Sequence, residues 1–139
     1  MQPIRVTLQE GMHFLGELDG FGIHIDADEA VGGKNKGPRP KGLSLISLAG
    51  CTAMDVISIL RKMKVEPEEF YVDVAAVELT DQHPKVFKKI LLKYYLKGVD
   101  IPRKKVEKAV ELSQTRYCGV TAMLEHSAKI DYEIVIEEV

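Results

Sequence analysis

Cysteine is scarce in this 139-residue chain, which contains only Cys51 and Cys118. A small secreted protein stapled by disulfides would carry more cysteines in a shorter chain. The N-terminal residues also lack the apolar segment of a secretory signal peptide. We therefore expect a soluble cytoplasmic protein, in which two cysteines are either inert core residues or a redox pair.

An excess of charge of one sign is also absent. The formal net charge is −2, and charged residues make up 29% of the chain. Proteins that bind nucleic acid or anionic membrane surfaces usually carry a basic patch or stripe. Here lysines and glutamates alternate along the chain, so we expect no nucleic-acid partner and no membrane partner.

Motifs for metals and nucleotides are missing as well. None of the four histidines lies three or four positions from another histidine or from a cysteine, and no C-x-x-C occurs. A structural zinc site needs four convergent ligands. The Gly-rich segment 31–42 lacks the G-x-x-x-x-G-K-[ST] pattern of a phosphate-binding loop. The sequence therefore predicts no metal site and no cofactor.

The hydrophobic pattern predicts a single α+β domain over residues 1–139, with a mostly antiparallel sheet. An Asp-Gly pair between two alternating runs indicates an early hairpin. Helix competes with strand at residues 86–97, where aromatic and β-branched content favours strand. The expected strands lie within residues 4–31 and at residues 68–79, 86–97 and 129–139, with helices from residue 102 and from residue 119.

Residues 43–63 predict a long helix that is apolar nearly all round. Asp55 is the only charge between residues 43 and 60. A helix of this kind is buried on most sides. Its length would also suit a membrane span, but Asp55 and four hydroxyl residues dilute the run and no second hydrophobic segment exists. We therefore expect a buried central helix that packs against a second copy of the chain.

Cys51 lies inside this helix, behind two small residues. Free cysteine is among the most buried residue types, so a core role is the simpler interpretation. A reactive cysteine must instead be a thiolate, with a pKa lowered from about 8.5. The cations nearest to the two cysteines in the sequence are Arg39, Lys41 and Arg116. Residue types alone leave both interpretations open.

The chain resembles the OsmC/Ohr family of osmotically induced and organic-hydroperoxide-resistance proteins. GPRPKGLSLISLAGCTAMDVISILRK is similar to the family's Gly-Pro-x-Pro loop and cysteine-bearing helix, and TRYCGVTAML resembles its second cysteine motif. GMHFLGELDGFGIHID resembles the early strands of the OsmC branch. The two cysteine motifs also stand in the family's order.

The resemblance implies an OsmC-like fold and an intertwined homodimer with active sites at the subunit interface. It further implies a thiol-dependent peroxidase for organic hydroperoxides, which acts in oxidative stress defence. Cys51 would attack the peroxide, Cys118 would resolve the sulfenic acid as a disulfide, and a dithiol reductant would reopen it.

Two family features are missing. Lys41 and Gly42 stand where the family usually has a glutamate, and no arginine lies between Arg5 and Arg39. Lys41 is then either a solvated loop lysine or a mobile point charge that stabilises the Cys51 thiolate. This predicts a Cys51 pKa lowered only modestly and a slow peroxidase. The alternative is a non-catalytic dimer that binds a small hydrophobic ligand at its interface.

Overall fold

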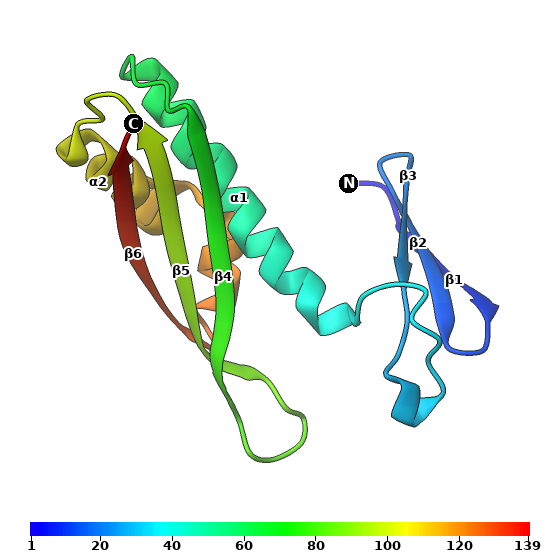
Figure 1. The fold of residues 1–139 in the computed structure, drawn as a ribbon. Coiled ribbons are helices and arrows are strands. Elements are labelled where there is room, and N and C mark those ends of the chain that lie inside the picture. The colour runs from blue at the N-terminus through cyan, green and yellow to red at the C-terminus, as the bar shows by residue number, and fades with distance from the viewer. The chain divides into compact units, whose positions relative to one another are not determined.

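The computed structural model describes all residues 1–139, which form two compact units, Met1–Ser44 and Leu45–Val139. The predicted α+β class is confirmed (Figure 1), and three of the four strand pairings are antiparallel. The six strands are β1 (Arg5–Glu10), β2 (His13–Leu18), β3 (Phe21–Ile25), β4 (Glu69–Leu79), β5 (Phe87–Gly98) and β6 (Lys129–Glu138). The α-helices are α1 (Pro40–Lys62), α2 (Arg103–Leu112) and α3 (Gly119–Leu124), with a 3₁₀ turn η1 (Glu29–Val31) and a π-helical turn η2 (Ser113–Tyr117).

The first unit contains a three-stranded antiparallel meander, β1-β2-β3. The predicted hairpin is confirmed, because Leu18 pairs with Phe21 across the turn. Asp19 and Gly20 occupy the turn with φ angles of 51° and 85°. Two consecutive positive φ angles give the turn a twist that matches the strands, and Asp-Gly adopts them readily.

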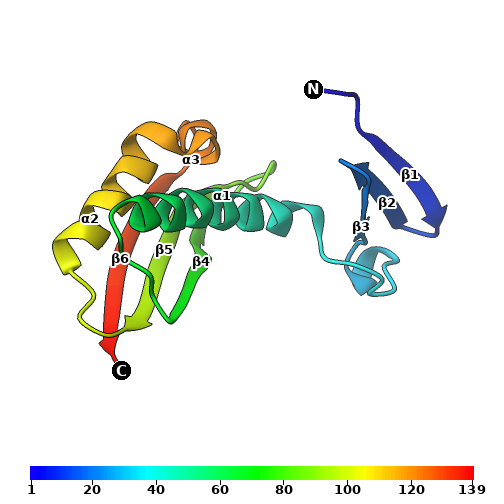
Figure 2. The same cartoon turned by 90° about the horizontal axis from the view of Figure 1, so that it is seen from above.

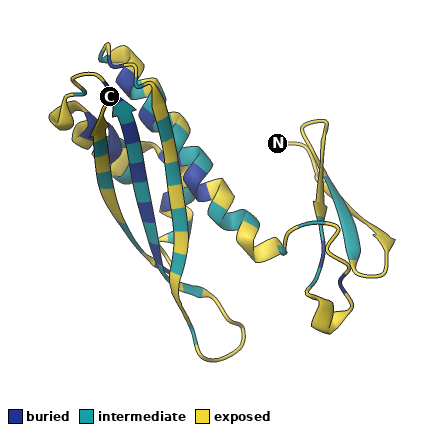
Figure 3. Cartoon of the chain, in the orientation of Figure 1, coloured by how far each residue is buried: buried dark blue, intermediate teal, exposed yellow.

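The strand register collects apolar side chains on one face of this meander. Val6 pairs with Gly16, which pairs with Ile23, and residues directly opposite each other share a face. The apolar face comprises Val6, Leu8, Phe14, Gly16, Leu18, Phe21, Ile23 and Ile25. Much of it is exposed (Figure 3), including 53% of Val6 and 73% of Phe21. An apolar sheet face of this kind marks an interaction surface.

The second unit has the sheet β4-β5-β6, with the helices on one face of it (Figure 2). Residues 87–98 form a strand rather than a helix, and it is antiparallel to β4 as predicted. β6 pairs in parallel with β5, which the sequence did not predict. Parallel neighbours need a long crossover connection, and the segment with α2 and α3 supplies it.

Helix α1 begins three residues earlier than predicted. Pro40 is its first residue, a position where the missing N–H of proline costs nothing. Its buried residues, Leu48, Ala49, Thr52, Val56 and Leu60, join the core formed with β5 and α2. Ile46 and Met54 remain 64% and 74% exposed, so burial within one chain reaches one side of the helix.

By length and composition α1 could also cross a membrane. The core helix of a soluble protein satisfies the same criteria. Leu48, Val56 and Leu60 are fully buried against protein in the core. Only 28% of the apolar window is buried within one chain, so the core interpretation holds for this side of the helix.

Candidate functional site

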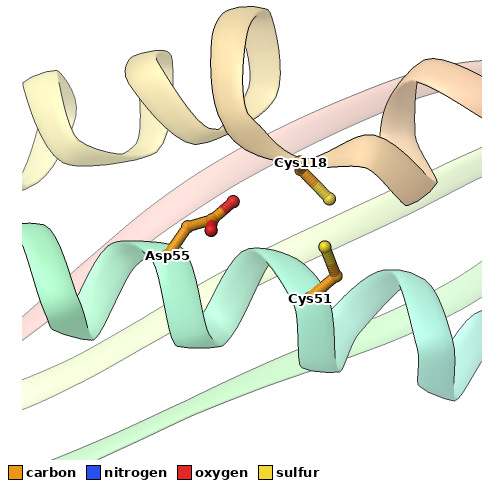
Figure 4. A group of neighbouring side chains, drawn as sticks. All are labelled: Cys51, Asp55 and Cys118. Carbon is orange, nitrogen blue, oxygen red and sulfur yellow. The ribbon is translucent and has the colours of Figure 1, made fainter.

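Cys51 and Cys118 meet in the second unit, together with Asp55 (Figure 4). The two sulfurs and a carboxylate oxygen of Asp55 all lie within 4.8 Å of one another. Cys51 and Asp55 are four residues apart on α1, which places them on one face of the helix. Both thiols are free, and their sulfurs point toward each other. The structure thus brings together two residues that are far apart in the sequence.

Cys118 reaches this position from the junction between η2 and α3. The π-helical turn ends with a hydrogen bond from the Cys118 N–H to the Ser113 carbonyl, at 2.8 Å. Cys118 is then the N-cap of α3, and its sulfur accepts a hydrogen bond from the Thr121 N–H at 3.4 Å. The buried Cys118 side chain is therefore held toward α1 by the backbone on both sides.

The pKa of Cys51 is raised in this structure, so the predicted lowering is wrong. Partial burial, which disfavours a thiolate, raises the pKa of Cys51, and its hydrogen bond with the Cys118 thiol raises it further. The negative charge of Asp55 acts in the same direction. A hydrogen bond with the Val120 backbone opposes them without reversing the shift. No lysine or arginine is among these groups.

The three cations proposed from the sequence have other surroundings. Arg39 lies in the first unit, where Nε forms an ion pair with Asp28 at 3.0 Å and Nη1 donates to the Gly37 carbonyl. Lys41 lies in the first turn of α1, ten residues before Cys51, or about 15 Å along the helix axis. Arg116 is exposed, and its guanidinium lies 5.4 Å from the centre of the Tyr117 ring.

A buried hydrogen-bond network that the sequence analysis missed surrounds Asp55. Ser113 Oγ donates to Asp55 Oδ2 at 2.9 Å, and Thr52 Oγ1 lies 2.7 Å from Ser113 Oγ and 2.6 Å from the Tyr94 hydroxyl. Gln114 Nε2 donates to both Thr52 and Tyr94, at 3.1 Å each. The only signal in the sequence was a set of polar residues inside apolar segments.

Thr52 is the hub of this network, which leads to a stability prediction. Thr52→Val keeps the side-chain shape but leaves the fully buried Tyr94 hydroxyl without an acceptor for its proton and removes a hydrogen bond from the buried Ser113 hydroxyl. We expect the free energy of unfolding to fall by about 1–3 kcal/mol, measured by urea denaturation. Ser58→Ala, at an exposed position on the same helix, is the control and should change it by less than about 0.5 kcal/mol. An equal effect of both substitutions would contradict the network's structural role.

Two sets of donor atoms meet that the sequence analysis did not pair. Cys51, Asp55 and Cys118 have donor types found in metal sites, but each already takes part in a hydrogen bond within the chain. In the first unit, His13 Nε2 lies 2.8 Å from His24 Nδ1. Neighbouring strands bring these histidines together, which a search by helical spacing does not detect.

The chain has relatives among known proteins. A family model described as OsmC-like protein matches residues 33–133. Protein YhfA of Escherichia coli K12 is 35% identical over 134 residues, covering 94% of this chain and 96% of its own. A hypothetical protein from Aquifex aeolicus has a TM-score of 0.82 at 29% identity, covering 99% and 98% of the two chains.

An organic hydroperoxide resistance protein OsmC from Legionella pneumophila has a similar fold. Its TM-score is 0.70 at 15% identity, and the match covers 97% of this chain and 98% of the other. At this identity the similarity concerns the fold alone.

Proposed function

Because the chain belongs to the OsmC-like protein family, we propose that it is a thiol-dependent peroxidase that reduces organic hydroperoxides in oxidative stress defence. The observation that carries the proposal is the approach of the Cys51 and Cys118 sulfurs within one chain. The name of the Legionella protein agrees with this activity. Cys51, the more accessible thiol, is the peroxidatic residue, and the buried Cys118 is the resolving residue.

In the first step, the Cys51 sulfur attacks the terminal oxygen of the hydroperoxide. The O–O bond breaks, an S–O bond forms, and the alcohol leaves after its oxygen takes up the thiol proton. Cys51 is oxidised to a sulfenic acid while the hydroperoxide is reduced to an alcohol. Cys51 packs against the hydrophobic core, and such surroundings suit a hydroperoxide with an apolar chain.

In the second step, the Cys118 sulfur attacks the Cys51 sulfenic acid. An S–S bond forms, the S–O bond breaks, and water leaves. A disulfide needs a sulfur–sulfur distance of about 2.05 Å, so the two side chains must approach from their present separation. A dithiol reductant then opens the disulfide by thiol–disulfide exchange and is itself oxidised to a disulfide.

The proposal includes a cytoplasmic homodimer in which residues 1–139 act as one OsmC-like domain. Two exposed apolar surfaces support it. One is the apolar face of the β1-β2-β3 meander, and the other is the side of α1 with Ile46 and Met54. A second copy of the chain would bury both. The dimer would also offer the partner's cations to each Cys51, so Arg39, Lys41 and Arg116 remain candidates for thiolate support.

A substitution on the meander tests the dimer. Ile23→Lys places a charge on the apolar face, and we expect it to weaken the dimer by about tenfold to a hundredfold, from the loss of one buried aliphatic side chain. Sedimentation equilibrium over a range of concentrations gives the dissociation constant. Thr7→Lys, on the opposite face, is the matched control. A monomeric mass for the unmodified protein at micromolar concentration would contradict the dimer.

The raised pKa of Cys51 favours a second candidate function. With its pKa raised, the thiol is largely protonated at neutral pH and reacts slowly with peroxide. A non-catalytic dimer that binds a small hydrophobic ligand at its interface would need no thiolate.

Turnover of cumene hydroperoxide with dithiothreitol as the reductant separates the two functions. The peroxidase should consume hydroperoxide over many turnovers per chain. A protein that only binds ligands should leave the hydroperoxide at its uncatalysed rate of loss.

A further inference from the structure

We propose that Asp55 is the proton-transfer residue of this site, serving Cys51 during peroxide attack and Cys118 during disulfide formation. The inference rests on the proposed function and extends it to a residue outside the cysteine pair. Its basis is the position of the carboxylate, within 4.8 Å of both sulfurs (Figure 4), and the hydrogen-bond network that ends on it.

The direction of every hydrogen bond in this network follows from the one that ends on Asp55. Ser113 has one hydroxyl proton and donates it to Asp55 Oδ2, so the bond between Ser113 and Thr52 must be donated by Thr52. Thr52 then has no proton left, so Tyr94 donates to Thr52. The donors therefore run in one direction, from Tyr94 through Thr52 and Ser113 to the carboxylate.

The hydrogen bonds of Gln114 and the raised pKa of Tyr94 support this direction. Gln114 Nε2 donates to both Thr52 and Tyr94 and so occupies acceptor positions on the two hydroxyl oxygens. Burial raises the pKa of Tyr94 to about 12, so its phenol keeps the proton that the network requires. Ser113 occupies one acceptor position on Oδ2, and the carboxylate keeps others with which it can accept a proton from a thiol.

The proton balance of both steps needs such an acceptor. The Cys51 thiol must lose a proton as its sulfur attacks, and the departing alkoxide must gain one. Asp55 accepts the first proton and passes it to the alkoxide, so the net reaction gives a sulfenic acid and an alcohol. In the second step it takes the Cys118 proton and delivers it to the departing hydroxide, which leaves as water. Asp55 ends each step as a carboxylate.

The alternative is that Asp55 only hinders the site, since its charge raises the pKa of Cys51. The titratable groups around the carboxylate are Cys51 on α1, Cys118 beside α3 and Tyr94 on β5. The two accounts predict opposite signs for Asp55→Asn. Removal of a repelling charge would lower the Cys51 pKa and speed the reaction, whereas removal of a proton acceptor would slow it.

The test compares the unmodified protein with Asp55→Asn, which keeps an oxygen for Ser113 but cannot accept the proton. Asp73→Asn, exposed on β4, is the control. The first readout is the rate of Cys51 sulfenic acid formation with cumene hydroperoxide. The second is the opening by dithiothreitol of the Cys51–Cys118 disulfide, prepared with diamide, because Asp55 then takes the proton of the attacking dithiothreitol thiol and delivers it to the departing thiolate. The second readout needs no peroxide.

We expect Asp55→Asn to slow sulfenic acid formation at neutral pH by about a hundredfold or more and disulfide opening by at least about tenfold. In Asp55→Asn, the rate of sulfenic acid formation should follow the thiolate fraction of Cys51 and rise about tenfold per pH unit below the Cys51 pKa. In the unmodified protein the same rate should rise less steeply with pH. Ser113→Ala, which keeps the carboxylate but loses its anchor, should give an intermediate loss. This variant tests the role even if Asp55→Asn does not fold.

Unchanged or faster reactions of Asp55→Asn in both readouts would overturn the proton-transfer role. If the unmodified protein forms no sulfenic acid but Asp55→Asn slows disulfide opening, the peroxidase proposal fails and the role of Asp55 stands.

Discussion

The Cys51→Ser variant should reduce organic hydroperoxides at least about a thousandfold more slowly than the unmodified protein, and it should keep its fold. A serine hydroxyl is a far weaker nucleophile than a thiol and forms no sulfenic acid. Cys51 is only partly buried, so the loss of sulfur should change the core little. Hydroperoxide consumption is measured with dithiothreitol in excess, and circular dichroism confirms that the variant is folded.

Cys118→Ser, the matched cysteine-to-serine change, is the control for Cys51→Ser, because it should still react once with hydroperoxide. Retention of hydroperoxide reduction by folded Cys51→Ser would show that another group attacks the peroxide. Cys118 would then be the only thiol left to do so.

Cys118→Ser itself should stop after the first step. Cys51 would form a sulfenic acid that has no thiol partner within the chain, and further peroxide would drive it to the irreversible sulfinic acid. We expect no intramolecular disulfide and a loss of sustained turnover, monitored by intact mass and by hydroperoxide consumption. Multi-turnover reduction by this variant with the same dithiol would show that Cys118 is not the resolving residue.

Most elements of the fold follow from the sequence because their apolar periodicity is strong. The period of two at residues 68–79 and the Asp-Gly turn before Phe21 specify strands and a hairpin on local grounds alone. The pairing of β6 does not follow in the same way. Alternation shows that residues 129–139 form a strand but not which strand lies beside it, or in which direction.

The sequence likewise predicted one part of the site and missed another. The motifs around Cys51 and Cys118 predicted two functional cysteines, and the structure places both in one cluster. Asp55 appeared in the sequence only as a lone charge in an apolar helix, although its spacing of four residues from Cys51 was visible. The expected direction of the Cys51 pKa shift was wrong for this chain. The prediction was based on the cations of the loop, whereas partial burial, the hydrogen bond with Cys118 and the charge of Asp55 raise the pKa.

The central claim is that Cys51 and Cys118 act as a redox pair within one chain. It is tested most directly by adding one equivalent of cumene hydroperoxide to the reduced protein, counting free thiols and mapping the peptides by mass spectrometry. The account predicts the loss of both thiols and a single peptide pair joined through Cys51 and Cys118 of the same chain. Two free thiols after prolonged exposure, with the hydroperoxide unreduced, would contradict it.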